Sequence, residues 1–142
     1  MRARNHVILS TGISLGFQAI VHSWPATFVC FLSGVLIDLD HYIEYYFHRG
    51  KLPDNYKELF NFCVPYKEKK IYLIFHAYEY LFILWLLIFF FHLNSMWLGL
   101  AIGLTAHLIS DQIANPIVPL GYLLTYRIQS QFESFKIIKQ NN

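Results

Sequence analysis

Two polar residues interrupt the apolar stretch 95–114: a histidine, His107, and an aspartate, Asp111. Four residues separate them, so on a helix they share one face and both can reach one metal ion. Ionisable side chains at membrane depth are costly unless something pairs with them. The pair therefore predicts a metal site, to which the rest of the chain is expected to supply further ligands.

Two further pairs of histidine and carboxylate have helical spacing. Asp38 and His41 are three residues apart, as are His76 and Glu79, and residues at this spacing also share a helix face. One more histidine, His6, precedes the first apolar stretch. Helix bundles build dinuclear metal sites by projecting such pairs inward.

The residue types limit the chemistry. Imidazole and carboxylate ligands without thiolate suit Zn²⁺, Mn²⁺ or Fe²⁺, and we expect two or three divalent ions, with zinc the first choice. Two such ions generate hydroxide at neutral pH and stabilise an in-line displacement at phosphorus. Glu79 or Asp111, where not a ligand, is the expected general base, and Arg49 the expected phosphate contact. The two cysteines have no CxxC neighbour, so a thiolate site is not expected.

Composition indicates a membrane protein. The chain has 142 residues, which predicts one domain over 1–142. Apolar residues make up 56% and charged residues 14%, against roughly 25% charged in a typical soluble domain. We therefore expect an all-α, polytopic membrane helix bundle with membrane lipids as its partners. A formal charge of +2 is too small to indicate nucleic acid binding.

Hydropathy predicts four membrane helices, over about 7–21, 25–47, 71–93 and 96–114. The third is long enough to cross a bilayer core, which needs about 20 residues. The stretch 117–128 is apolar but broken by Pro119 and Gly121, so a short re-entrant or interfacial segment is expected there. Residues 49–70 form a polar connection.

Basic residues set the expected orientation. They gather before the first predicted helix, in the 49–70 connection and after the fourth helix, while the other two connections carry no Lys or Arg. The positive-inside rule then places both termini in the cytoplasm. All four predicted helices bring a histidine or a carboxylate to this same face, which favours a di- or trinuclear site there.

Other polar residues have simpler interpretations. A single histidine at a helix end is usually interfacial or hydrogen-bonded, which is the expectation for His22, His48 and His92. Asp40 points about 100° away from His41 on a helix. It could be a ligand, the hydrogen-bond partner of a ligating imidazole, or a helix cap.

Several segments together resemble a known family. They are His6, the segment Gly34-Val-Leu-Ile-Asp38-Leu-Asp40-His41, the following His48-Arg49-Gly50, and His107-Leu-Ile-Ser-Asp111. This pattern, covering most of residues 5–125, is similar to the bacterial LexA-binding, inner membrane-associated metal-dependent hydrolases. The chain departs from it in having Ile37 where the family has Pro, and Lys51-Leu-Pro where the family has Thr-His-Ser.

The resemblance implies metal ligation at seven positions: His6, Asp38, His41, His76, Glu79, His107 and Asp111. It also implies a hydrolase in the bacterial inner membrane. We expect a phosphoesterase acting on a lipid, a lipid-linked phosphate or another amphipathic phosphate ester at the cytoplasmic face. A di-iron membrane oxidoreductase and a non-catalytic metal-binding, metal-transporting or partner-binding membrane protein remain open alternatives.

Overall fold

The computed structural model describes residues 3–63 and 68–139 of the chain. Within these ranges the fold is all-helical, which confirms the expected class, and extended pairing is limited to two isolated bridges, Lys70 with Glu133 and Ile117 with Ile138. Contacts divide the chain into two compact units, residues 1–37 with 78–115 and residues 38–77 with 116–142. The single domain over 1–142 stays a prediction.

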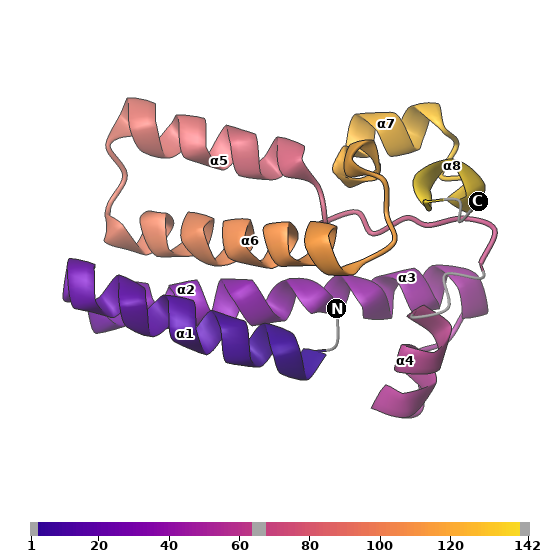
Figure 1. Cartoon of the computed structure of the whole chain (residues 1–142), viewed down its shortest axis with the longest axis horizontal. Helices are drawn as coiled ribbons and strands as arrows, with labels where there is room; N and C mark the ends of the chain where they lie inside the picture. Colours follow the sequence, from indigo (N-terminus) through magenta and orange to yellow (C-terminus); the bar gives the residue numbers. More distant parts are fainter. Residues whose placement is uncertain (1–2, 64–67, 140–142) are drawn as a thin grey trace. The chain divides into compact units, whose positions relative to one another are not determined.

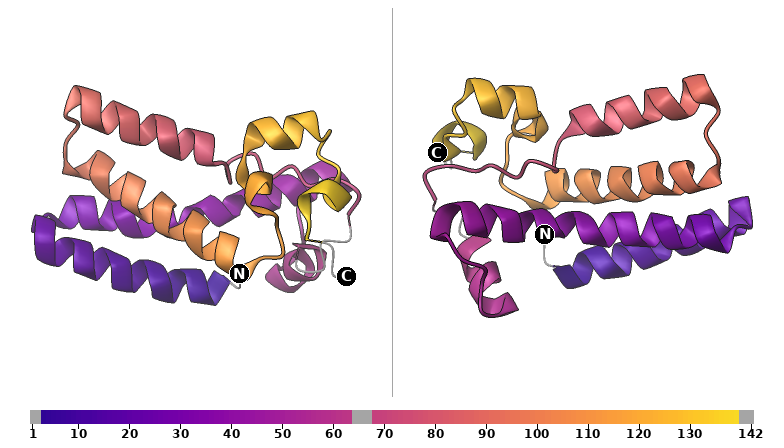
Figure 2. Two further views of the ribbon diagram at one scale, coloured as in Figure 1. Left: turned by 45° about the horizontal axis from the view of Figure 1, so that its top comes forward. Right: turned by 180° about the vertical axis from the view of Figure 1, so that it is seen from behind.

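The first unit is a group of four helices (Figure 1). They are α1 (Ala3–Val21), α2 (Trp24–Leu36), α5 (Tyr78–Phe91) and α6 (Ser95–Ala114). Helix α6 packs along α2, and α1 contacts both of them. Helix α5 runs antiparallel to α6, to which a short turn joins it (Figure 2).

Small residues let α6 approach the backbone of α2. A Cβ atom at Gly99 would overlap the carbonyl oxygen of Ala26, and one at Gly103 would overlap that of Cys30. Small residues four apart are the usual means of such close helix packing. His107 and Asp111 continue this row at the same four-residue spacing, so the packing of the glycines fixes the face on which the two polar residues lie.

Helix α1 presents a similar row to the interior. His6, Ser10 and Ser14 follow at four-residue steps and are all buried. A Cβ atom at Gly34 of α2 would lie 2.5 Å from Ser10 Oγ, so this glycine is needed for α1 to pack closely. The outer surface of the unit is strongly apolar, with Ile20 81% and Phe89 73% exposed.

The second unit consists of short helices and extended connections. A 3₁₀ turn, η1 (Ile37–Leu39), leads into α3 (Asp40–Arg49), which is followed by α4 (Tyr56–Cys63). The C-terminal part contains η2 (Pro119–Tyr122), α7 (Leu124–Gln129) and α8 (Ser134–Ile137). The stretch 117–128, expected to be re-entrant or interfacial, thus forms η2 and most of α7.

The predicted helix 71–93 is wrong in its first two turns. Helix α5 begins at Tyr78, and residues 71–77 are not helical. Leu73 has a φ of 36°, a left-handed conformation that costs a non-glycine residue about 1–2 kcal/mol. His76 therefore precedes the helix on which Glu79 lies, and the two do not share a helix face as their spacing predicted.

Long-range hydrogen bonds explain this difference. Asp40 and Glu44, one turn apart on α3, accept the backbone N–H groups of the segment, Asp40 from Phe75 at 2.8 Å and Glu44 from Leu73 at 2.8 Å. One turn further, His48 Nε2 lies 3.1 Å from the carbonyl oxygen of Lys70. Four residues of a helix rise about 6 Å, which is close to the length of two residues of extended chain. Each successive turn of α3 therefore lies beside the next pair of peptide groups in the segment 70–76.

Among the described residues, one helical stretch, Trp24–Arg49, is long and apolar enough to cross a membrane, with a mean hydropathy of 1.4. Helix α5 is apolar but shorter. The four membrane-spanning helices therefore stay a prediction, while the helical class is established.

The glycine contacts of α6 predict a loss of stability in Gly103→Ala. The added methyl group meets backbone and a short side chain that cannot move away, so the free energy of unfolding should fall by about 1–3 kcal/mol. Gly16→Ala is the matched control, because nothing lies within 4 Å of a Cβ there and alanine favours a helix over glycine by up to about 1 kcal/mol. Thermal unfolding of the two variants checks this; an unchanged midpoint for Gly103→Ala would contradict the packing.

Candidate metal centre

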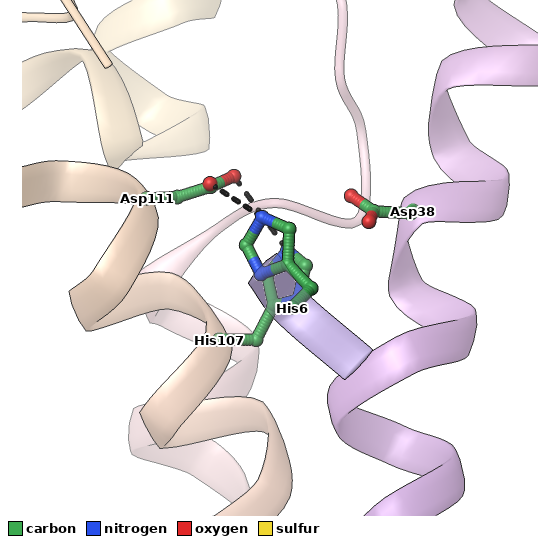
Figure 3. Close-up of side chains that lie close together, drawn as sticks. All are labelled: His6, Asp38, His107 and Asp111. Carbon is green, nitrogen blue, oxygen red and sulfur yellow. Dashed lines mark ion pairs between the residues drawn. The ribbon is translucent and has the colours of Figure 1, made fainter. Parts of the chain in front are cut away.

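Three buried side chains meet at one end of the first unit. His6 of α1 and His107 of α6 are each 1% exposed, and Asp111 of α6 is 2% exposed. Their potential ligand atoms lie within 4.8 Å of one another. We call these residues the His6 group. The two imidazole rings are stacked, with centroids 3.9 Å apart, and both face the carboxylate of Asp111 (Figure 3).

The distances between the two imidazole rings and the Asp111 carboxylate would allow all three side chains to bind one metal ion. His6 Nε2 lies 2.9 Å from Asp111 Oδ1, and His107 Nε2 lies 3.5 Å from Asp111 Oδ2. His107 Nδ1 lies 2.8 Å from the carbonyl oxygen of Gly34. A carbonyl oxygen can only accept a hydrogen bond, so the proton of a neutral His107 is on Nδ1. The lone pair of Nε2 is then directed to the group, as in metal-ligating histidines.

The environment of His6 is an independent test of whether the group fits a metal ion. Despite the short distance to Asp111, neither ring nitrogen of His6 forms a hydrogen bond to a described residue. A buried polar group without a hydrogen bond costs about 1–3 kcal/mol. A divalent cation would give an imidazole nitrogen a partner and would neutralise the carboxylate, so the donor set fits a metal ion.

A second group of the same composition lies in the second unit. Asp38, His41 and His76 also bring potential ligand atoms within 4.8 Å of one another, and we call them the His76 group. Asp38 Oδ1 lies 3.7 Å from His41 Nε2 and 3.9 Å from His76 Nε2. The group thus combines two imidazoles with one carboxylate, like the His6 group.

Asp40 orients His76 in this group. Its Oδ2 atom lies 3.0 Å from His76 Nδ1 and also accepts the backbone N–H groups of Phe75 and His76. A carboxylate that accepts from Nδ1 holds the proton there and leaves Nε2 for a ligand. Of the roles open to Asp40, the structure therefore shows the hydrogen-bond partner of an imidazole.

The two groups differ in their access to solvent. The side chains of His41 and Asp38 are 21% and 23% exposed, whereas all three members of the His6 group are buried. His41 also lines a pocket together with side chains that include Glu68 and Lys70. Of the two groups, the His76 group is therefore the more accessible to solvent.

Two predicted site residues lie outside these groups. Glu79 is half-buried in the first turn of α5 and belongs to neither group of described residues. Arg49, at the end of α3, donates from Nη2 to Glu68 Oε1 at 2.6 Å, and its guanidinium carbon lies 5.4 Å from the centre of the Phe62 ring. Its side chain is 50% exposed, so a phosphate would compete with Glu68 for it.

Sequence reasoning missed the buried charges around residues 70–77. Arg127 is 1% exposed and Glu44 6% exposed, and both bind the backbone of that segment. A signal for Arg127 was present, because it is the one charged residue within the apolar stretch 117–128. An isolated arginine in such a stretch is expected to be paired.

No family model, curated protein or solved structure matches the chain.

Cys63 lies in α4 and lines the same pocket as His41. Burial, together with the negative charges of Glu44 and Asp38, raises the pKa of its thiol to about 12. Because the thiolate is the form that binds metal and reacts, Cys63 is a poor ligand at neutral pH.

This pKa predicts slow alkylation of Cys63. An exposed cysteine at pH 8 is roughly one quarter thiolate, whereas Cys63 remains protonated, so its reaction with iodoacetamide should be at least about 100-fold slower. The rate should keep rising above pH 9. Mass spectrometry of the labelled peptides measures it, with Lys57→Cys, an exposed position on the same helix, as the reference. A rate at Cys63 that matches the reference and levels off near pH 9 would show an ordinary thiol.

Proposed function

We propose that the chain is a metal-dependent hydrolase of the phosphoesterase type, acting at a membrane on a lipid or amphipathic phosphate ester. The observation that supports this is the repetition of one ligand set. Each unit contains two imidazoles and one carboxylate with ligand atoms within 4.8 Å, and in each set one imidazole is oriented by an acceptor at Nδ1. Such orientation is typical of built metal sites.

The residues divide into holding and contacting roles. His6, His107 and Asp111 would hold one ion, and Asp38, His41 and His76 another. A divalent ion in such a site polarises an ester and activates water for attack. The exposed side of the His76 group would admit the substrate, and Arg49 would bind phosphate after leaving Glu68.

Lys70 supplies a second positive charge near the same place. Its side chain lines the pocket that His41 also lines, and it is solvent-exposed. Together with Arg49 it would attract an anionic substrate. Glu79, which neither ligand group includes, remains the proposed general base where Asp111 acts as a ligand.

Surface composition supports action at a membrane. Side chains of α5 such as Phe82, Phe89 and Phe90 are 65–73% exposed, and large exposed apolar side chains gathered on one helix favour contact with a membrane or a protein. The charge distribution of the sequence favours a cytoplasmic location for both termini. The resemblance to the LexA-binding hydrolases implies the bacterial inner membrane and a hydrolytic reaction.

A di-iron oxidoreductase is the second candidate, and one observation favours it. Two histidines and one carboxylate with open positions hold a single iron ion in non-haem Fe(II) oxygenases, so two such groups could together hold two iron ions. Bound iron with a visible charge-transfer band would favour the oxidoreductase over the hydrolase.

Metal analysis of protein purified in detergent without added metal tests the ligand groups. We expect two or more equivalents of Zn, Mn or Fe per chain by plasma mass spectrometry. His107→Ala, Asp111→Ala and His76→Ala should each lose metal, because each removes a ligand from a three-residue set. His92→Asn should keep the wild-type content, since His92 has a φ of 49° that asparagine tolerates. No bound metal after reloading, with folding unchanged, would exclude the hydrolase.

A substrate panel tests the reaction class. The metal-loaded protein should release phosphate or alcohol from phospholipids or long-chain phosphate monoesters in mixed micelles. Arg49→Met should raise KM by about tenfold or more, because a charge-assisted hydrogen bond to phosphate contributes at least about 1.5 kcal/mol. Lys139→Met serves as the control, since this lysine is remote in sequence from both groups. Turnover of soluble phosphodiesters without any turnover of lipid would contradict the membrane substrate.

A further inference from the structure

Arg127 of α7 is the largest fully buried side chain in the part of the chain that the structure describes, at 1% exposed. Its charge does not titrate at any physiological pH. Taking a guanidinium out of water is unfavourable unless its donors are satisfied. The groups that satisfy them therefore show what the residue is placed to hold.

The Nη donors of Arg127 bind the backbone of the segment that carries His76. Arg127 Nη1 donates to the carbonyl oxygen of Tyr72 at 2.6 Å and to that of Leu73, and Nη2 donates to the carbonyl oxygen of His76 at 2.9 Å. One guanidinium thus spans the segment from residue 72 to residue 76. The planar fork of arginine allows this, whereas the single ammonium of a lysine does not.

The same segment is held by negative charge through its N–H groups. Asp40 accepts from the backbone N–H and from Nδ1 of His76, and Glu44 accepts from the N–H of Leu73. Carboxylates therefore bind the donors of these peptides and Arg127 binds their acceptors. Both ends of the His76 residue, its N–H and its C=O, are fixed by buried charges.

We propose that Arg127 is a positioning residue that sets the metal affinity of the His76 group. It acts by holding the carbonyl groups of residues 72, 73 and 76, so that the ring of His76 stays directed toward Asp38 and His41. This rests on the proposed function, since it requires the His76 group to bind metal. The positive φ of Leu73 indicates that the segment would otherwise adopt a different backbone.

Other contacts of the segment indicate that an Arg127 variant should still fold. The start of the segment is also anchored by backbone hydrogen bonds, from Ile71 N to Phe132 O and from Ser134 N to Lys69 O, both at 2.9 Å. These do not involve the guanidinium. Loss of Arg127 should therefore release residues 72–76 without detaching the C-terminal part.

Metal titration of the full-length protein tests the proposal. Co²⁺ binding is followed by its visible spectrum, and the two classes of sites are assigned with His76→Ala and His107→Ala. Arg127→Met should weaken the class that His76→Ala removes by about 10–100-fold, the usual effect of losing a residue that orients a ligand. The class that His107→Ala removes should be unchanged. Lys136→Met removes an exposed cation from the same C-terminal part and should alter neither class.

Two further variants separate positioning from general loss of the fold. Arg127→Lys should fall between wild type and Arg127→Met, because it keeps the charge but cannot reach all three carbonyls. Arg127→Ala should regain Co²⁺ affinity when guanidinium is added at non-denaturing concentration, and sodium at the same ionic strength should have no effect.

The outcomes are distinguishable. Wild-type affinity in Arg127→Met, an equal loss in both classes, or failure of guanidinium to restore Arg127→Ala would each overturn the positioning role. A wild-type protein that binds no Co²⁺ at all would overturn the proposed function, and the positioning role with it.

Discussion

A buried peptide group must have a hydrogen-bond partner, and the residues leading into α5 have neither a helix nor a sheet to provide one. Buried charges provide it instead. Asp40 and Glu44 bind the N–H groups, and Arg127 binds the carbonyls. Because the partners are charged, each hydrogen bond is stronger than a neutral one. The conformation of this segment, and with it the place of His76, follows from that electrostatic arrangement.

The two ligand groups are positioned by different means. In the first unit, regular helices and small residues position the ligands. Gly99 and Gly103 allow α6 to pack closely against α2, and His107 Nδ1 then lies within hydrogen-bond distance of the carbonyl oxygen of Gly34. In the second unit, His76 lies on irregular backbone held by side chains. The first arrangement depends on shape and the second on charge, so packing substitutions should disturb the first and removal of a buried charge the second.

The local sequence pattern was sufficient to predict the helix that carries His107 and Asp111. It was insufficient to predict the conformation of the segment that carries His76. The four-residue spacing of His107 and Asp111 is a property of one helix, and α6 formed over nearly the predicted range. The stretch 71–77 is apolar and adjoins a helix, so its composition favoured an extension of α5. Carboxylates from α3, 28–36 residues earlier in the chain, compete for the N–H groups that a helix would use. Such long-range competition leaves no local signal.

The sequence distance between His76 and Arg127, 51 residues, also has a consequence for biosynthesis. A chain is made from its N-terminus, and its parts fold as they become available. When residues 71–77 emerge from the ribosome, Asp40 and Glu44 have already been synthesised. Arg127, which binds the carbonyl groups of residues 72, 73 and 76, has not. The segment therefore passes through a period in which only one side of its backbone is satisfied. Maturation of the His76 group is a late event, completed only after nearly all of the helical framework has been synthesised.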